Sequence, residues 1–421
     1  MSSLAYACLW LFVFSLPWEL LTASNGITII TRVTGVIAVA AALGVALVDG
    51  RVRRWHLFHM AALLFVLWAG FGLLINEGLG VIPKKFYTYL QLFLVLLIIW
   101  ELAPRRSRVL GLLLAYVLGA YVASLETVHT YITRANEVHR FAAEGFDPND
   151  LAMTLALALP MAWYLSMTHS RPLARWISGA YVPLGVVSIL LTGSRGGMVA
   201  TIVALMIVPL TMVRLSKARR AVAIFVLVLS GALAIIYVPD TVVQRLATTT
   251  SEFQGDVSIG GRFKLWRAGL YAFLDQPVIG YGPGSFKPVV MPQLGRLAQV
   301  AHNSYISVLV EQGLVGFVLY GLMLVTVWLA IMRLPILERR FAMVLMATLA
   351  VAMLPLTWED HKAVWFILAT LLGLAKAEAF PLPGAVQHVR TRYGAPAGQP
   401  RPAARPLATP VGRMPDRDAR A

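Results

Sequence analysis

The chain has 421 residues, of which 58% are hydrophobic and only 13% are charged, and its mean hydropathy is +0.73. Soluble domains carry about 25% charged residues, so the composition excludes a soluble globular enzyme and favours a protein solvated by a bilayer. A formal charge of +16 would indicate a nucleic-acid partner in a soluble protein, but these basic residues lie in short loops between apolar runs, where they set membrane topology. The single cysteine, Cys8, excludes an intrachain disulfide framework and a CxxC-type metal site.

Apolar runs long enough to cross a bilayer recur along the chain, and we count about twelve of them, each of roughly 20 residues. The first, Leu4 to Leu21, follows no Lys or Arg and has no clear cleavage site, so we expect a retained helix rather than a removed signal peptide. The predicted spans are 4–22, 27–48, 57–76, 84–102, 108–133, 151–168, 174–193, 196–214, 220–238, 304–331, 341–358 and 362–380. The sequence therefore predicts an all-α, polytopic membrane protein.

The loops between the predicted spans differ in charge. Loops rich in Lys and Arg alternate strictly with loops that hold fewer basic residues and most of the acidic ones. The positive-inside rule places the basic loops and both termini in the cytoplasm, and the other loops on the outward side. The basic loop residues are Arg51, Arg53, Arg54, Arg105, Arg106, Arg108, Arg171, Arg175, Arg214, Lys217, Arg219, Arg220, Arg333, Arg339 and Arg340.

Two regions of the chain differ in composition. Residues 1–380 form the predicted transmembrane domain, whose sizeable outward loops are about 134–150 and 239–303. Residues 381–421 are rich in Pro, Ala, Gly and Arg, so we expect a disordered basic tail in the cytoplasm. No internal repeat indicates the duplicated halves of a transporter.

A very short turn, Gly193-Ser194-Arg195-Gly196-Gly197, joins two apolar runs at the outward end. Glycines let a ligand approach backbone N–H groups closely, and the next helix offers its positive N-terminal end. Arg195 adds a guanidinium whose fork of donors suits phosphate, so the turn is a candidate anion site. The alternative interpretation is a helical hairpin whose arginine extends to the lipid headgroups.

A second basic feature lies in the long outward loop, where Gly260-Gly261-Arg262 begins the stretch 262–274. The apolar residues that recur there at helical spacing are Phe263, Trp266, Leu270 and Phe273. This spacing predicts an amphipathic helix on the membrane surface. Such a helix can simply anchor the loop to anionic lipid, or Arg262 can form a second arm of a phosphate clamp.

His302 and Asn303 stand where the long loop re-enters the membrane. Histidine titrates near neutrality and can serve as a general base, although an interfacial histidine is also often only an anchor or a hydrogen-bonding residue. Glu311 falls inside the following apolar run. An ionisable group in a membrane helix is costly, which makes Glu311 a functional candidate; the alternative is a buried hydrogen bond that fixes helix packing.

Acidic residues or asparagine occur at two further outward positions. Glu359 or Asp360, in the short turn before the last run, could pair with an arginine or orient His302, or the turn could simply be solvated. Asn149 or Asp150 is typical of a helix cap and could also lie near the site.

Several nucleotide and metal motifs are absent from the sequence. It has no GxGxxG or Walker loop, no His/Asp/Glu cluster with metal spacing and no DxD pair. We therefore expect arginines and helix ends to hold any phosphate, and the substrate to be activated already.

Three of these motifs occur in order along the chain: Gly-Ser-Arg-Gly-Gly at 193–197, Gly-Gly-Arg-x-x-x-Trp at 260–266, and His302-Asn303 followed by Glu311-x-Gly-x-x-Gly. Together with the long outward loop, this arrangement resembles the bacterial O-antigen ligase family, which belongs to a group that also includes O-antigen polymerases and O-oligosaccharyltransferases. The resemblance covers about residues 4–380.

The resemblance implies a GT-C-like glycosyltransferase of the bacterial inner membrane. It would transfer O-antigen polysaccharide from undecaprenyl pyrophosphate to a sugar hydroxyl of lipid A–core on the periplasmic face, without metal or cofactor. Arg195 and Arg262 match arginines that bind the pyrophosphate, and His302 matches the catalytic base. Asp360, or Glu359 in its place, matches a catalytic acidic residue. The supporting residues are Asn303, Glu311, Gly193 and Gly196.

The expected chemistry agrees with these assignments. A pyrophosphate leaving group develops negative charge that cations near the membrane surface stabilise. No carboxylate nucleophile is evident, so we expect direct attack by the acceptor and inversion of the anomeric configuration. The alternatives are a polymerase that uses a second lipid-linked repeat as acceptor, and a transporter of the lipid-linked polysaccharide.

Overall fold

The computed structural model describes residues 2–21, 30–49, 53–76, 84–134, 140–213, 215–237 and 259–379, and all regular structure in these ranges is helical. The predicted tail 381–421 and the first part of the long loop, up to residue 258, lie outside the described residues. The described helices are α1 (Ser2–Ser15), η1 (Leu16–Trp18), α2 (Ile30–Asp49), α3 (Leu57–Ile75), α4 (Lys84–Leu102), α5 (Arg106–Arg134), α6 (Pro148–Thr168), α7 (Pro172–Leu191), α8 (Arg195–Leu205), α9 (Ile207–Met212), α10 (Lys217–Tyr237), α13 (Ile259–Asp275), α14 (Phe286–Leu294), η3 (Gly295–Leu297), α15 (Ser304–Ile331), α16 (Ile336–Ala352) and α17 (Lys362–Ala379).

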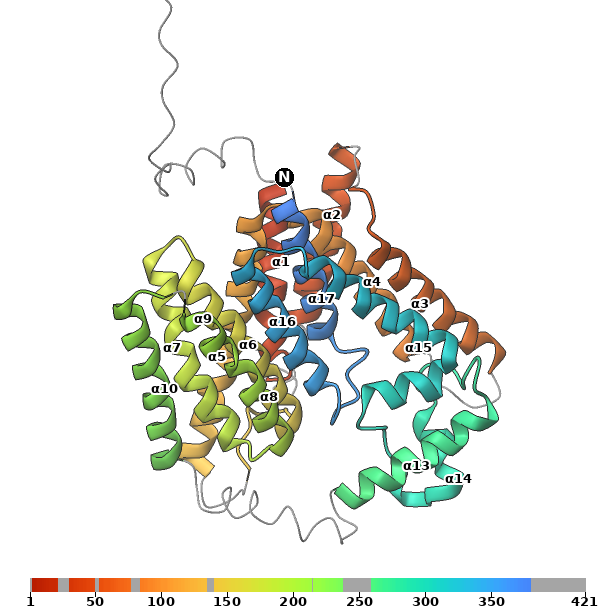
Figure 1. Ribbon diagram of the computed structural model, residues 1–421. Helices are drawn as coiled ribbons and strands as arrows, with labels where there is room; N and C mark the ends of the chain where they lie inside the picture. Colours follow the sequence, from red (N-terminus) through yellow and green to blue (C-terminus); the bar gives the residue numbers. More distant parts are fainter. Residues whose placement is uncertain are drawn as a thin grey trace, which may run out of the picture. The chain divides into compact units, whose positions relative to one another are not determined.

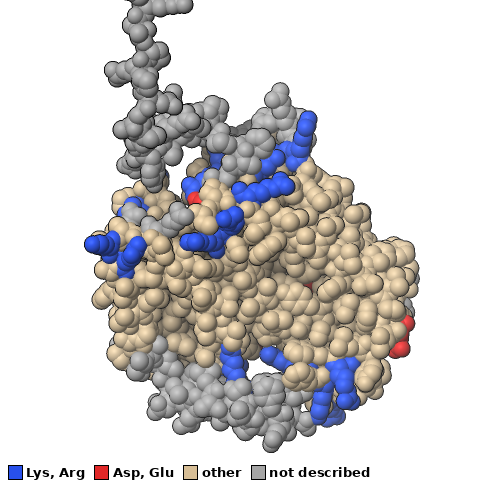
Figure 2. Space-filling model, viewed as in Figure 1, with Lys and Arg blue, Asp and Glu red and all other residues tan. Residues whose placement is uncertain are grey.

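The fold is that of a multi-pass membrane protein. Among the described residues, seven helical segments are long and apolar enough to cross a membrane: α3, α4, α5, α6, α7, α8 with α9, and α15. Figure 2 shows an uncharged band across the visible face, with Lys and Arg side chains gathered at its upper and lower edges. Such a band matches the apolar core of a bilayer. Each predicted span overlaps a described helix or a pair of successive helices (α1 with η1, and α8 with α9), whereas the count of twelve crossings remains a prediction.

Helix α6 lies at the centre of the packing. Every residue from Leu151 to Leu165 is buried, and α5, α7, α8 and α16 all contact this helix. Its run of alanines lets neighbouring backbones approach closely, as small residues do between membrane helices. The close contact extends to the first turn of α8, where a Cβ on Gly197 would lie 2.4 Å from the Cβ of Ala152. The start of α8 is thereby fixed beside the start of α6.

Figure 1 shows α13 and α14 at the opposite end of the helices from the start of α1, and we call the end that carries α13 and α14 the site end. Helix α13 confirms the amphipathic helix predicted at 262–274. Its buried residues, Leu265 and Ala268, pack with Phe286 of α14, while Phe263 and Leu270 of the predicted stripe stay exposed. The other two residues of the stripe, Trp266 and Phe273, are partly buried and pack against the same cluster, so only part of the predicted apolar stripe faces outwards.

The predicted span 341–358 differs from the structure in its bounds. Helix α16 starts after Pro335 and ends at Ala352, because Pro355 cannot donate the backbone hydrogen bond that a longer helix would need. Residues 353–361 form an irregular connection to α17 at the site end. The predicted turn at the acidic residues is thus longer than expected, and it begins well before them.

Helix α15 is broken at Gly313, whose φ of 62° and ψ of −168° are not helical. The loop before α14 lies in the break: the N–H of Gly282 donates to the carbonyl of Glu311 at 2.7 Å, and the N–H of Leu314 donates to the carbonyl of Pro277 at 2.8 Å. Backbone groups freed by a break inside a membrane protein need such partners. The break is therefore a built junction between α15 and the 277–284 loop.

Gly313→Ala is expected to destabilise the protein strongly. The left-handed backbone alone costs a side chain about 1–3 kcal/mol, and the new Cβ would lie 2.3 Å from the carbonyl oxygen of Val278. Gly321→Ala is the matched control on the same helix, since nothing lies within 4 Å of its Cβ position and alanine favours a helix. Thermal unfolding in detergent measures both; equal midpoints for the two variants would contradict the built junction.

Candidate active site

The predicted anion turn sits at the site end, between α7 and α8. Gly193 has a φ of 59°, a left-handed conformation that favours glycine. The hydroxyl of Ser194 accepts from the N–H of Gly197 at 3.2 Å and caps α8, so that Arg195 is the first residue of the helix. A Cβ on Gly196 would lie 2.9 Å from a methionine side chain of α6. Gly196 and Gly197 thus serve the close packing of α8 on α6, and Arg195 occupies the first position at the positive end of α8.

The start of α6 completes this corner. Asp147 caps α6 by accepting from the N–H of Asn149 at 2.8 Å, which confirms a helix start at the predicted place but with Asp147 as the cap. The amide oxygen of Asn149 accepts from Arg140 Nη2 at 2.9 Å and from Ser194 Oγ at 3.0 Å. One side chain therefore ties the start of α6 to the turn that carries the first candidate arginine.

His302 lies between η3 and α15, as the sequence predicts. Its φ of 47° makes it the one non-glycine residue with a left-handed backbone among the described residues. Its N–H donates to Thr357 Oγ1 at 2.9 Å, and its Nε2 lies 3.3 Å from Gln299 Oε1. Asn303 caps α15 by accepting from the N–H of Ile306 at 3.0 Å. A sparsely populated backbone held by neighbouring contacts is typical of functional positions.

Two charged residues set the protonation of His302. Burial lowers the pKa of the imidazole, the positive charge of Arg262 lowers it further, and the carboxylate of Asp147 opposes both effects. The same carboxylate also interacts with Arg262, whose own pKa burial lowers. The structure therefore brings Arg262, His302 and Asp147 within electrostatic reach of one another. The lowered pKa keeps the imidazole in its neutral, proton-accepting form, and the Asp147 carboxylate favours the imidazolium that proton transfer creates.

Helix α13 is tied to the histidine loop by a tryptophan of the second motif. Trp266 Nε1 donates to the carbonyl of Ala301 at 2.8 Å. Because Trp266 follows Arg262 by one helical turn, this bond holds the start of α13 next to residue 302. The Gly-Gly-Arg-x-x-x-Trp spacing thus has a geometric purpose that the sequence alone did not reveal.

The loop 353–361 is not a solvated turn. Trp358 and Glu359 are fully buried, and Trp358 Nε1 donates to Asp150 Oδ1 of α6 at 3.0 Å. The ring of His361 stacks on Trp358 with 4.3 Å between centroids, and burial lowers the pKa of this imidazole to about 3. The loop therefore connects the start of α6 to the histidine segment through Thr357.

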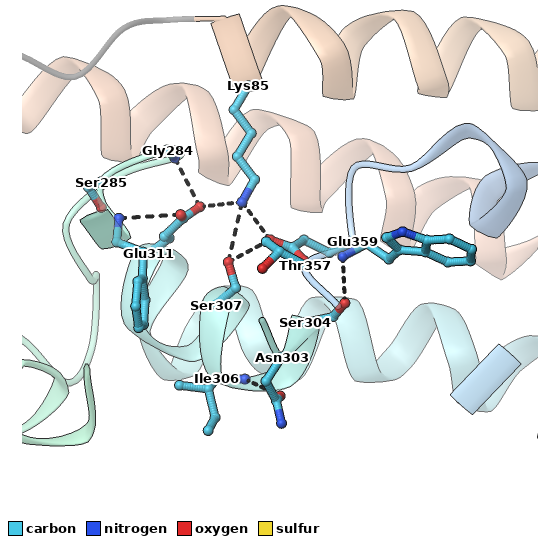
Figure 3. Close-up of polar contacts among 12 residues, drawn as sticks. Lys85, Gly284, Ser285, Asn303, Ser304, Ile306, Ser307, Glu311, Thr357 and Glu359 are labelled. Carbon is cyan, nitrogen blue, oxygen red and sulfur yellow. Dashed lines mark hydrogen bonds and ion pairs between the residues drawn. The ribbon is translucent and has the colours of Figure 1, made fainter. Parts of the chain in front are cut away.

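A buried ionic cluster lies beside this loop (Figure 3). Lys85 Nζ of α4 lies 2.8 Å from Glu311 Oε2 and 2.5 Å from Glu359 Oε1. Ser307 Oγ donates to Glu359 Oε1 at 2.6 Å, and the N–H of Gly284 donates to Glu311 Oε2 at 2.9 Å. Lys85 was not among the residues predicted from the sequence. The signal was present, since an isolated glutamate in an apolar run requires a buried cation, and the start of another run offered one.

Asp360 lies next to this ionic cluster. Burial raises the pKa of its carboxyl to about 6, the charge of Lys85 opposes the rise, and the carboxylates of Glu359 and Glu311 add to it. The groups that act on His302 are Arg262 and Asp147 instead. The structure therefore places Asp360 with the lysine cluster, while its predicted catalytic role stays a prediction.

Part of the chain is similar to known proteins. Residues 180–321 match the family model described as O-antigen ligase. An uncharacterized protein of Haemophilus influenzae is 20% identical over 189 residues, which cover 41% of this chain and 47% of that protein. The chain thus spans about half the length of this relative. Residues 180–321 of this membrane protein therefore match the O-antigen ligase family, and this segment holds both candidate arginines, His302 and Glu311.

Proposed function

We propose that the protein is an O-antigen ligase of the bacterial inner membrane. It transfers O-antigen polysaccharide from undecaprenyl pyrophosphate to a sugar hydroxyl of lipid A–core, on the periplasmic face and without metal or cofactor. One observation carries the proposal. Inside the segment that matches the family, the half-buried His302 has a left-handed backbone, and the charge of Arg262 lowers the pKa of its imidazole. Family membership by itself supports the coarser function of a ligase or polymerase of this glycosyltransferase-like group.

The donor's pyrophosphate is assigned to Arg195 and Arg262. Arg195 combines a guanidinium with the positive end of α8, and Arg262 lies in the first turn of the interfacial helix α13. As the bond between the anomeric carbon and the pyrophosphate breaks, the leaving oxygen takes the electron pair. Two fixed cations stabilise that charge in the transition state without reorganisation. Gly193 and Gly196 support this arm by letting α8 begin against α6.

The acceptor hydroxyl is activated by His302. The neutral imidazole takes the hydroxyl proton while the oxygen forms its bond to the anomeric carbon, which inverts the configuration there. Asn303 and Glu311 support the base by capping α15 and by fixing the loop before α14. We assign the role of the catalytic acidic residue, which the resemblance leaves to Asp360 or Glu359, to Asp360. Burial raises the pKa of the Asp360 carboxyl to about 6, which suits proton exchange near neutrality. Glu359 Oε1 is already held by Lys85 and Ser307.

Asp147→Asn is expected to move the acidic limb of the kcat profile to lower pH. Activity needs the neutral imidazole and is lost as pH falls through its pKa, and the Asp147 carboxylate raises that pKa. Asparagine caps a helix as well as aspartate does, so α6 keeps its start. Glu144→Gln, an exposed carboxylate of the same loop, is the control and leaves the profile unchanged. An acidic limb at the same pH in Asp147→Asn and in the wild type would show that the Asp147 carboxylate does not act on His302.

Complementation of a strain that lacks the protein tests the proposed function. The ligase account predicts uncapped lipid A–core together with accumulated lipid-linked polymer in the null strain, and polymer-capped lipopolysaccharide after complementation. Core capped by a single repeat in the null strain would instead identify a polymerase. Gel profiles of lipopolysaccharide and of lipid-linked polymer, run side by side, separate these outcomes.

A further inference from the structure

The proposed reaction does not use Lys85, although its ammonium joins α4 to two other parts of the site, α15 and the 353–361 loop. The side chain is 11% exposed, and its two carboxylate partners are 3% and 0% exposed. The partners come from α15, through Glu311, and from the 353–361 loop, through Glu359. Figure 3 shows the lysine extending from α4 to both carboxylates and to Ser307.

Each of the two carboxylates that bind Lys85 also fixes another part of the site. Glu311 accepts from the N–H groups of Gly284, at 2.9 Å, and Phe286, at 3.4 Å, which fixes the loop before α14. Glu359 fixes the 353–361 loop. Neighbouring residues of that loop hold the histidine segment: Thr357 accepts from the backbone of residue 302.

The same loop also holds the start of α15. Ser304 Oγ donates to the carbonyl of Leu356 at 2.9 Å and accepts from the N–H of Trp358 at 2.7 Å. The segment before α15 is thus bonded to this loop at several successive positions. A shift of the loop would therefore shift the backbone that gives His302 its left-handed conformation.

Charge makes the lysine indispensable to this arrangement. One ammonium stands against two buried carboxylates, so the cluster has a formal charge of −1 when all three groups are ionised. Without the lysine, the two carboxylates would face each other without a cation. Removing one partner of a buried ion pair is far more disruptive than replacing the set together.

We propose that Lys85 is a positioning residue of the ligase site, which ties α4 to Glu311 and Glu359 and thereby holds the loops that place His302. The inference rests on the proposed function for its catalytic consequence. The holding of the loops can be measured without any activity.

The test compares Glu359→Gln with the double variant Lys85→Met/Glu359→Gln. The double variant keeps the wild-type cluster charge of −1, because one positive and one negative charge are removed together. It can therefore be measured even if the single variant Lys85→Met does not fold. Hydrogen exchange by mass spectrometry is followed in segments 299–303 and 354–361, together with kcat and KM of the reconstituted reaction. Arg106→Met/Glu338→Gln is the matched control, because this ion pair (2.7 Å) lies beyond the opposite end of α4.

We expect faster exchange in both segments of the Lys85 double variant, relative to Glu359→Gln, and a kcat lower by up to about 10²-fold, the effect of a catalytic group misplaced by about 1 Å. KM for the donor changes little, since the arginines are untouched. The control pair changes neither segment.

Wild-type exchange in both segments of the double variant would overturn the proposal, as would faster exchange with an unchanged kcat. If the wild-type protein transfers nothing, the proposed function fails, and the exchange result still decides whether Lys85 holds the loops.

Discussion

Replacing His302 with alanine is expected to lower kcat by about 10²–10⁴-fold, the range that a positioned general base contributes. The acceptor hydroxyl then has no group to take its proton, while the donor's pyrophosphate still meets both arginines. The KM for the donor should therefore stay near its wild-type value. Initial rates of transfer, measured over a range of donor concentrations with reconstituted protein, separate kcat from KM.

His129→Ala is the control for this substitution. His129 is an exposed histidine near the end of α5, with its Nδ1 3.5 Å from Glu126 Oε1, and it is not assigned to the site. Its variant should transfer polymer at the wild-type rate. A His302→Ala protein with wild-type kcat would show that the imidazole is not the base, and the assignment of a strained backbone to catalysis would fall with it.

Replacing Arg195 or Arg262 with alanine should produce the second large loss, about 10²–10³-fold in kcat for each, as removing one donor of an oxyanion site does elsewhere. The affected charge develops on the leaving pyrophosphate, so the transition state loses more than the ground state does. Lysine keeps the charge but loses the forked geometry, and it should restore activity only in part.

Arg267→Ala provides the matched comparison for Arg262→Ala. Both arginines are on α13, but Arg267 is exposed and lies more than one turn further along the helix. Its loss should leave kcat unchanged. If the Arg195 and Arg262 variants were fully active while Arg267→Ala was not, donor recognition would have to be reassigned to the exposed face of the helix.

Much of the fold follows from local sequence signals. Apolar runs of bilayer length and turns rich in Gly, Pro and charge predict where each membrane helix lies, because a bilayer leaves the backbone few alternatives. The helical spacing after Gly261 likewise predicts α13. The break at Gly313 could not be predicted, since it depends on a loop some thirty residues earlier, from Pro277, that supplies the missing hydrogen bonds.

The candidate site was predictable only in part. Arg262 and His302 share an environment, as their order and sidedness suggested. Lys85 was missed because its partners are more than 200 residues away, and its burial cannot be read from a lysine at the start of an apolar run. Asp147 was noticed only as part of a helix start, because an exposed cap gives no local sign of the charges that fold against it.

The acidic turn shows how burial changes an interpretation. Glu359 and Asp360 are adjacent in sequence and look equivalent there. In the structure Glu359 is fully buried against Lys85, whereas Asp360 remains partly exposed with a raised pKa. Only the packing of the 353–361 loop between α6, α15 and α4 separates the two carboxylates.

Reconstitution tests the central claim most directly. Purified protein is placed in liposomes with undecaprenyl-pyrophosphate-linked O-antigen and lipid A–core, with EDTA and without nucleotide. The account predicts polymer-capped lipid A–core and the release of one undecaprenyl pyrophosphate for each chain transferred, with the activity abolished in His302→Ala. Liposomes that only move the lipid-linked polymer across the bilayer, or that only lengthen it on its own carrier, would contradict the account.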